Sequence, residues 1–237
     1  MKKYLAILLT VIPLFCFAGS HDSWSYSGKT GPEHWGSLSL HYRTCASGLH
    51  QSPINITTTK LNRKAPMIQF HYNNHLKTII NKGHTLKINV APGNYIIVNH
   101  NEYELLQFHF HHPSEHLIDG KRYPMELHLV HRNARGAVLV IGVLIQSGKA
   151  NPAIKAIWQH LPEQAQEKRA LNDLKIQLSA LLPQTLTTPP CSEGVSWYVM
   201  EHPITLSADG IKTFTKMFPK NARPTQALNG RVITSSN

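Results

Sequence analysis

Histidines on two short segments offer the clearest chemistry in this sequence. In ELLQFHFHHPSEH (104–116), His109 and His111 alternate with Phe108 and Phe110. Alternate side chains of a β-strand share a face, so the two imidazoles point one way and the two phenyl rings the other. Such a strand is either half-buried with polar residues facing solvent, or it carries two metal ligands that await a third.

A candidate third ligand lies in the segment ELHLV, where Glu126, His128 and Val130 share a face by the same alternation. If this segment pairs antiparallel with the first, His128 faces the same cavity as His109 and His111. Three protein ligands and an open fourth position are typical of a catalytic zinc site, for which neutral imidazole is a suitable ligand. Unrelated histidines on the polar faces of two strands are the alternative.

The segments around these histidines are predicted to be strands. Their β-branched and aromatic content favours extended backbone. The segment 137–148, AVLVIGVLIQSG, is continuously apolar, as expected for a strand buried on both faces. We expect strands within the segments 67–72, 78–90, 95–111, 125–133 and 137–148.

Helical signals are fewer. NPAIKAIWQHLP begins with Asn151 as a cap and Pro152 in the first turn, and it stops at Pro162. A second helix is predicted over 173–182, followed by loop and strand, with an ordered loop and a final strand in the tail. The N-terminal region of the mature chain is expected to be irregular and tied down by aromatic residues: Trp24, Tyr26 and Trp35. The sequence therefore predicts a mainly β (α+β) fold with short peripheral helices.

The first 18 residues have the pattern of a secretory signal peptide. MKKYLAILLTVIPLFCFA contains two lysines, a short apolar run and small residues that suit cleavage after Ala18. An uncleaved membrane anchor is the alternative, and no other uncharged apolar stretch is long enough to span a bilayer. We expect residues 1–18 to be removed, residues 19–237 to form one domain, and the protein to be periplasmic or secreted.

Two cysteines, Cys45 and Cys191, remain after the signal peptide is set aside. In an oxidising compartment an even number of cysteines favours a disulfide. One disulfide would close a loop of well over a hundred residues and contribute about 4–5 kcal/mol in the chain-entropy model. Two free thiols are the alternative.

The chain is basic, with 24 Lys and Arg against 13 Asp and Glu and a formal net charge of +11. Such a charge can indicate a nucleic-acid or anionic-surface partner. The basic residues are scattered, however, without a basic block or an aromatic-interleaved stripe. We therefore expect no nucleic-acid partner and attribute the charge to solubility, with attraction of small anions as a further effect.

Seven motifs in sequence resemble the α-class carbonic anhydrases, over the region from about Trp24 to the end of the chain. The motifs are GPEHWG (31–36), QSPINI (51–56), NKGHTLKI (81–88), QFHFHHPSEH (107–116), ELHLVH (126–131), LTTPPCSEGVSW (186–197) and NARPTQ (221–226). The places of Cys45 and Cys191 beside two of these motifs are similar to those of the disulfide in exported bacterial members.

The resemblance implies one domain around a large, mostly antiparallel twisted β-sheet, with zinc in a conical cavity. It implies that His109, His111 and His128 bind Zn²⁺ and that a zinc-bound hydroxide converts CO2 reversibly to bicarbonate and a proton. A zinc-bound water with a pKa of about 7 is a known property of these enzymes. The function implied is that of a zinc-dependent carbonate dehydratase, a lyase.

The same resemblance gives each ligand a partner that fixes the tautomer of its ring. The pairs are Gln107 with His109, Glu126 with His128, and the backbone carbonyl of Asn221 with His111. An ordinary polar edge of a sheet is the alternative for these partners.

Substrate contacts are implied by further matches. Thr187 matches the residue whose hydroxyl accepts from the hydroxide and donates to Glu115, and its backbone N–H would hold a CO2 oxygen. Thr188 is assigned to the same substrate site. Because CO2 has no net charge or dipole, the pocket is expected to have an apolar wall. The residues that match this wall in the family are Val130, Val140, Leu186 and Trp197. Without the resemblance, each of them would be assigned to the hydrophobic core.

His84 in NKGHTL matches the proton shuttle of the family, and Tyr26 matches a tyrosine of its proton network. Imidazole titrates near neutral pH, which suits it to pass a proton to solvent. Lys82 and Lys87 flank His84 where neutral polar residues are commoner, and nearby ammonium groups disfavour the protonated ring. An exposed, idle histidine is the alternative.

Two other functions are weighed beside CO2 hydration. A non-catalytic relative that binds a ligand would usually lack a zinc histidine, and this chain has all three. A periplasmic zinc-binding protein would use the surplus among its 16 histidines and hold several ions. We expect CO2 and bicarbonate as small-molecule substrates and no membrane span after signal cleavage, and a homodimer is compatible with the sequence, which does not fix the oligomeric state.

Overall fold

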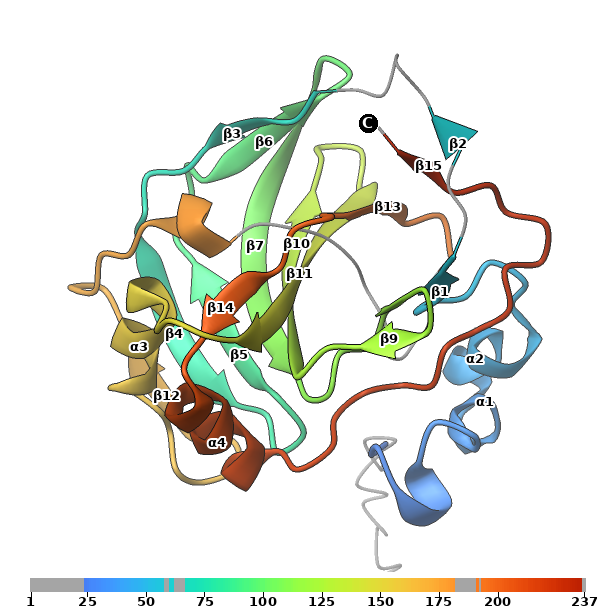
Figure 1. Cartoon of the computed structure of the whole chain (residues 1–237), viewed down its shortest axis with the longest axis horizontal. Coiled ribbons are helices and arrows are strands. Elements are labelled where there is room, and N and C mark those ends of the chain that lie inside the picture. Colours follow the sequence, from blue (N-terminus) through green and yellow to red (C-terminus); the bar gives the residue numbers. More distant parts are fainter. Residues whose placement is uncertain (1–23, 58–59, 62–66, 182–190, 192, 236–237) are drawn as a thin grey trace, which may run out of the picture.

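A computed structural model describes residues 24–57, 60–61, 67–181, 191 and 193–235, so the predicted signal peptide lies outside the described residues. Its centre is a ten-stranded, mostly antiparallel sheet (Figure 1). Seven strands follow the order β12–β4–β5–β7–β10–β11–β13, while β14 also pairs with β11, β6 with β7 and β3 with β6. The strands are β3 (Gln69–His71), β4 (Leu76–Asn81), β5 (Leu86–Val90), β6 (Tyr95–Val98), β7 (Asn101–His111), β10 (Met125–Arg132), β11 (Val138–Ser147), β12 (Lys168–Ala170), β13 (Ser196–Val199) and β14 (Ile204–Leu206).

The strand predictions are confirmed because every predicted segment contains a strand of this sheet. β11 is buried along seven consecutive residues, as its continuous apolar run indicates. Two small sheets lie beside the main one. They comprise β1 (Asn55–Ile56), β8 (Leu117–Ile118) and β9 (Lys121–Arg122) in one, and β2 (Lys60–Leu61) and β15 (Thr234–Ser235) in the other.

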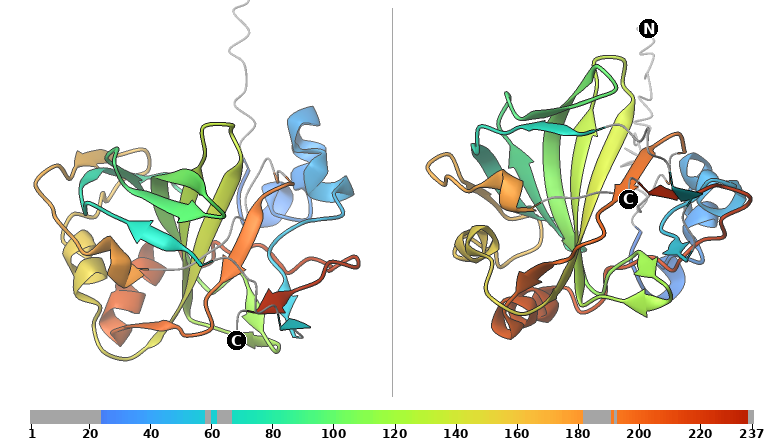
Figure 2. Two further views of the ribbon diagram at one scale, coloured as in Figure 1. Left: turned by 90° about the horizontal axis from the view of Figure 1, so that it is seen from above. Right: turned by 45° about the horizontal axis from the view of Figure 1, so that its top comes forward.

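One face of the sheet is covered by α3 (Pro152–Trp158) and α4 (Ala208–Met217), which lie together on one side of the molecule (Figure 2). The ring of Phe110 on β7 lies 4.8 Å from the ring of Trp158 on α3 and 6.0 Å from that of Phe214 on α4. The phenylalanine face of β7 therefore belongs to the main hydrophobic core. The histidine face of the same strand points to the opposite side of the sheet, where the candidate metal ligands lie.

The N-terminal segment lies toward the histidine face. It contains η1 (Gly28–Thr30), α1 (Trp35–Leu38), η2 (Leu40–Tyr42) and α2 (Thr44–Ser47), which Figures 1 and 2 show on the side away from α3 and α4. Tyr26, Trp35 and the two cysteines form a small buried cluster against which Trp24 packs. The aromatic anchors predicted from the sequence are confirmed, and short helices lie between them.

The helix predictions are right at one place and wrong at two. Asn151 caps α3, because its Oδ1 accepts from the N–H groups of Ala153 and Ile154 at 3.0 and 3.2 Å. The helix predicted over 173–182 is wrong: only η3 (Leu178–Leu181) forms there. Residues 172–173 form a turn instead, and Lys175 pairs with His75 in an antiparallel β-bridge.

The other error concerns α4, which the sequence did not indicate. Gly210 in the first turn and two threonines lower its intrinsic helix propensity. Ser207 compensates as an N-cap, since its Oγ accepts from the Gly210 N–H at 3.2 Å, and Phe214 is buried against the sheet. Among the described residues there is no candidate membrane-spanning helix.

Candidate active site

The pairing of β7 with β10 brings the three predicted histidines together. Cα partners across this antiparallel pair are His109 with His128 and His111 with Glu126, so all four side chains share one face. The ring centroids of the histidines lie 5.0 Å (His109–His111), 5.2 Å (His109–His128) and 4.3 Å (His111–His128) apart. One ring nitrogen from each lies within 4.8 Å of the other two.

Each of these rings has one nitrogen engaged outside the cluster. His109 Nδ1 lies 3.0 Å from Gln107 Oε1, His111 Nδ1 lies 2.7 Å from the Asn221 carbonyl oxygen, and His128 Nε2 lies 3.0 Å from Glu126 Oε1. All three acceptors require an N–H from the ring. The remaining nitrogens, His109 Nε2, His111 Nε2 and His128 Nδ1, therefore present lone pairs toward one another.

The lone pairs fit a divalent metal ion. His111 Nε2 and His128 Nδ1 are buried and have no hydrogen-bond partner in the described part of the chain. Burial is the main cause that holds the pKa of each of the three histidines below its ordinary value. The rings are thus neutral at physiological pH, which is the form that binds a metal.

Glu126 is the most heavily hydrogen-bonded carboxylate near the cluster. Its Oε2 accepts from the backbone N–H groups of Glu115 and His116 at 2.8 Å each, and its Oε1 accepts from His116 Nδ1 at 2.8 Å as well as from His128. Burial raises the pKa of Glu126, but the two histidines and these donors outweigh it and hold the pKa well below its ordinary value. The carboxylate is therefore ionised and fixed in orientation.

Glu115 lies beside the cluster, fully buried. Its Oε1 accepts from the Arg223 N–H at 2.7 Å, whereas its Oε2 has no partner within the described ranges. Burial raises the pKa of this carboxyl group well above its ordinary value, against the lowering by the Arg223 N–H. The predicted contact residues Leu186, Thr187 and Thr188 lie outside the described residues, so the expected hydrogen bond from Thr187 to Glu115 stays a prediction.

A row of apolar side chains crosses the sheet next to the histidines. Val130 on β10 pairs with Val140 on β11, which pairs with Trp197 on β13. Cα partners in adjacent strands point to the same face, so these three side chains line the sheet on the side of His128. Val130 and Val140 are buried, while Trp197 is half-buried with its ring 5.2 Å from that of His116.

His84 lies in the turn between β4 and β5, where Gly83 has a φ of +81°. Its ring lies 4.2 Å from that of Trp24 and 6.5 Å from that of Tyr26. Burial, and then the charge of Lys82, lowers the pKa of His84 to about 4. The ammonium effect expected from the sequence thus has the expected sign, but burial is the larger cause.

Tyr26 connects the N-terminal cluster to the site. Its ring lies 6.4 Å from that of His111, and its hydroxyl is buried without a hydrogen-bond partner among the described residues. Burial raises the pKa of this phenol well above its ordinary value, so it stays protonated.

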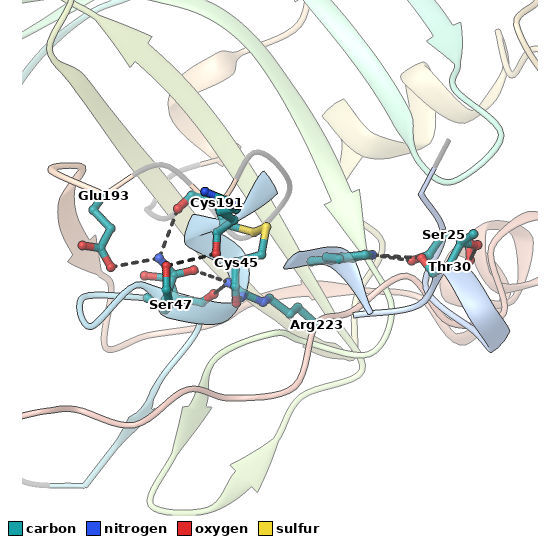
Figure 3. Close-up of a disulfide and its surroundings, with 11 residues drawn as sticks. Ser25, Thr30, Cys45, Ser47, Cys191, Glu193 and Arg223 are labelled. Atoms are coloured by element: carbon teal, nitrogen blue, oxygen red, sulfur yellow. Dashed lines mark hydrogen bonds between the residues drawn. A yellow bond between two sulfur atoms is a disulfide. The ribbon is translucent and has the colours of Figure 1, made fainter. Parts of the chain in front are cut away.

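The predicted disulfide is confirmed. Cys45 and Cys191 are joined with an S–S distance of 2.08 Å across 146 positions of sequence (Figure 3). It links α2 to the start of the segment that leads into β13.

Two residues near the site were not singled out from the sequence, His116 and Arg223, and Lys87 was noted only as a neighbour of His84. His116 lies inside a motif, but nothing in its spacing indicates its bond to Glu126. Lys87 alternates with the core residues of β5, so its position opposite His109 could have been inferred from a correct strand register. Arg223 is 3 % exposed, and nothing in the sequence around it predicts such burial.

The sheet topology, the buried trio of histidines and the partners of their outer nitrogens together define a class of metal-binding β-protein. Residues 30–237 match the model of the family described as eukaryotic-type carbonic anhydrase. The chain belongs to this family of α-carbonic anhydrases, which are zinc-dependent lyases.

Individual relatives agree with the family match. The chain is 43% identical over 248 residues to a carbonic anhydrase of Pectobacterium carotovorum, covering 98% of both proteins. It is 42% identical over 224 residues to a carbonic anhydrase of Nostoc sp. (strain PCC 7120), covering 89% of this chain and 85% of that one. The α-carbonic anhydrase from Thermovibrio ammonificans, solved with the inhibitor sulfanilamide, superposes with a TM-score of 0.86 at 40% identity, over 90% of this chain and 99% of the other.

Proposed function

We propose that this protein reversibly hydrates CO2 to bicarbonate with Zn²⁺ held by His109, His111 and His128. The observation that carries the proposal is the convergence of three neutral, buried imidazoles whose outer nitrogens are each engaged by an acceptor. Zinc in such a site supplies a nucleophile at neutral pH by lowering the pKa of a water. Family membership and the bacterial relatives named carbonic anhydrase support the same reaction.

The remaining residues would orient the metal ligands and the hydroxide, exclude water from the pocket and move the proton to solvent. Gln107, Glu126 and the Asn221 carbonyl hold the ligand rings, and Glu115 orients the Thr187 hydroxyl. Thr188 belongs to the same substrate site. The apolar wall binds CO2 and excludes competing polar ligands; it consists of Val130, Val140, Leu186 and Trp197. His84 passes the proton to solvent, with Tyr26 in the network between His84 and the metal site.

The disulfide supports export, because disulfides persist in oxidising compartments. We propose that residues 1–18 are a cleaved signal peptide, that residues 19–237 form one carbonic anhydrase domain, and that the protein works in the periplasm or outside the cell. Its substrates there are CO2 and bicarbonate.

Storage of several zinc ions is less well supported. In the part of the chain that the structure describes, the groups able to hold a metal are the trio above and a second group of His116, Glu126 and His128. The second group shares His128 with the first, and Glu126 already accepts four hydrogen bonds. The other described histidines form no such group.

Replacement of His111 tests the proposed site. His111→Ala removes one of three ligands, so zinc content and CO2 hydration should both be lost. Zinc is measured by atomic absorption and hydration by stopped flow. His202→Ala, at an exposed position, is the matched control and should retain both. Full activity of His111→Ala would refute the site.

A further inference from the structure

We propose that Arg223 is a positioning residue: its buried guanidinium fixes the backbone that holds Glu115 and His111 to the disulfide-bearing part of the chain. The inference rests on the proposed function for the roles of Glu115 and His111. Among the described residues, the hydrogen bonds of the Arg223 side chain go to Cys45, Gln51 and Ser52 and none goes to a metal ligand.

Residues 221–223 present two backbone groups to the site. The Asn221 carbonyl accepts from His111 Nδ1 at 2.7 Å, and the Arg223 N–H donates to Glu115 Oε1 at 2.7 Å. The Asn221 side chain fixes one end of this segment to β7, since its Oδ1 accepts from the His112 N–H at 2.6 Å and its Nδ2 donates to the Phe110 carbonyl at 2.9 Å. Beyond the Arg223 N–H, the other end is held by the Arg223 guanidinium and, three residues on, by the Gln226 N–H, which donates to the Pro53 carbonyl at 2.7 Å.

The Arg223 side chain reaches toward Cys45 in the N-terminal segment (Figure 3). Its Nη1 donates to the Ser52 carbonyl at 2.8 Å and to Gln51 Oε1 at 3.0 Å, and its Nη2 donates to the Cys45 carbonyl at 3.0 Å. The guanidinium carbon lies 5.5 Å from the ring centre of Trp35. One planar group thus binds three oxygens along residues 45–52.

The disulfide and its hydrogen bonds connect these acceptors to the chain around Cys191. Gln51, whose Oε1 binds Arg223, donates through Nε2 to the Cys191 carbonyl at 3.1 Å and to Glu193 Oε1 at 2.9 Å. The same Glu193 oxygen accepts from the His50 N–H at 2.6 Å. Both sides of the disulfide are therefore connected to the oxygens that hold the guanidinium, and we call this set (Cys45, Gln51, Ser52, Cys191 and Glu193) the disulfide platform.

An arginine rather than a lysine is needed at this position. Arg223 is 3 % exposed, and no carboxylate of the described residues forms a salt bridge with its guanidinium. A buried cation held mainly by neutral oxygens is weak in net stabilisation. Its planar array of N–H groups can nevertheless reach several fixed acceptors at once, which an ammonium group on a flexible stem cannot reproduce.

Arg223→Lys should therefore loosen the segment without removing the charge. We expect kcat to fall about 10-fold with KM unchanged and zinc to dissociate about 10-fold faster, the range found when outer partners of metal ligands are removed. The absorption spectrum of the cobalt-substituted protein should change, because the orientation of His111 changes. Each quantity is measured on folded, fully loaded protein well below its unfolding temperature, where a purely structural role would leave it unaltered.

Arg231→Lys is the matched control. Arg231 lies in the same tail, and among the described residues its guanidinium donates to the nearby carbonyls of Leu228 at 2.8 Å and Ala227 at 2.7 Å, with a charge interaction but no hydrogen bond to Glu193. This variant should keep wild-type kcat, zinc dissociation and cobalt spectrum. Folded Arg223→Lys protein with the values of the control would overturn the inference.

The double replacement Cys45→Ser with Cys191→Ser provides an independent test. If the platform acts through Arg223, loss of the disulfide should change kcat and zinc dissociation in the same direction, and adding Arg223→Lys should change them little further. Fully additive effects would contradict the coupling.

Should Arg223→Lys not fold, unchanged zinc dissociation in the cysteine variant would equally overturn the inference. If the wild type bound zinc without hydrating CO2, the proposed function would be wrong, and zinc dissociation would still decide the role of Arg223.

Discussion

At the scale of single residues, the chemistry of the site depends on the acceptor atoms that bind the outer ring nitrogen of each histidine. A side-chain amide, a backbone carbonyl and a carboxylate each take an N–H from one ring, so each opposite nitrogen is left as a metal ligand. Gln107 and Glu126 could be predicted from alternation, because each lies two residues from its histidine on one strand face. Asn221 lies 110 positions from His111 and was reached only through family resemblance.

The charge of Lys82 should be visible in the behaviour of His84. Because a nearby positive charge disfavours the protonated ring, Lys82→Gln should raise the pKa of His84 from about 4 toward the ordinary value. A shuttle whose pKa is closer to that of the donor water accepts the proton more readily, so kcat at pH 7 and low buffer should rise with KM unchanged. NMR titration of His84 and stopped-flow hydration measure the two effects.

A distant lysine separates the local effect from a general loss of charge. Lys149→Gln removes an exposed ammonium group outside β4 and β5 and should alter neither quantity. If the pKa of His84 were unchanged or lower in Lys82→Gln, the charge of Lys82 would not be a cause of the low pKa, and burial alone would account for it.

At the scale of elements, the strands were more predictable than the helices. Alternation along β7 and β10 places imidazoles on one face and apolar rings on the other, and this pattern leaves little choice of register. α4 could not be found in the same way, because its stability comes from a cap and from burial of Phe214 against the sheet rather than from its composition. The false helix over 173–182 had helix-forming residues but is held extended at Lys175 by pairing with His75.

Removal of the cap of α4 should affect stability and leave catalysis unchanged. Ser207→Ala deletes the acceptor of the Gly210 N–H, which typically costs about 1 kcal/mol. The free energy of unfolding, from urea titration, should fall by about that amount. CO2 hydration should be unaltered, since α4 covers the phenylalanine face of β7. A loss of activity without a loss of stability would mean that the two faces of the sheet are coupled.

At the scale of the whole molecule, the sheet separates two environments. α3 and α4 cover the apolar core, while the N-terminal segment and residues 221–223 meet on the histidine face. The sequence predicted the sheet, the disulfide and the convergence of the histidines. It did not predict the contacts of Arg223 that join residues 221–223 to the N-terminal segment, because single contacts of this kind have no periodic signal.

The most direct test is a stopped-flow assay of CO2 hydration on the purified mature chain before and after removal of zinc. We expect one tightly held zinc ion per chain, loss of hydration when a chelator removes it, and recovery when one equivalent of zinc is returned. Undiminished hydration by the metal-free chain, or several bound zinc ions with no hydration, would contradict a single catalytic zinc at His109, His111 and His128.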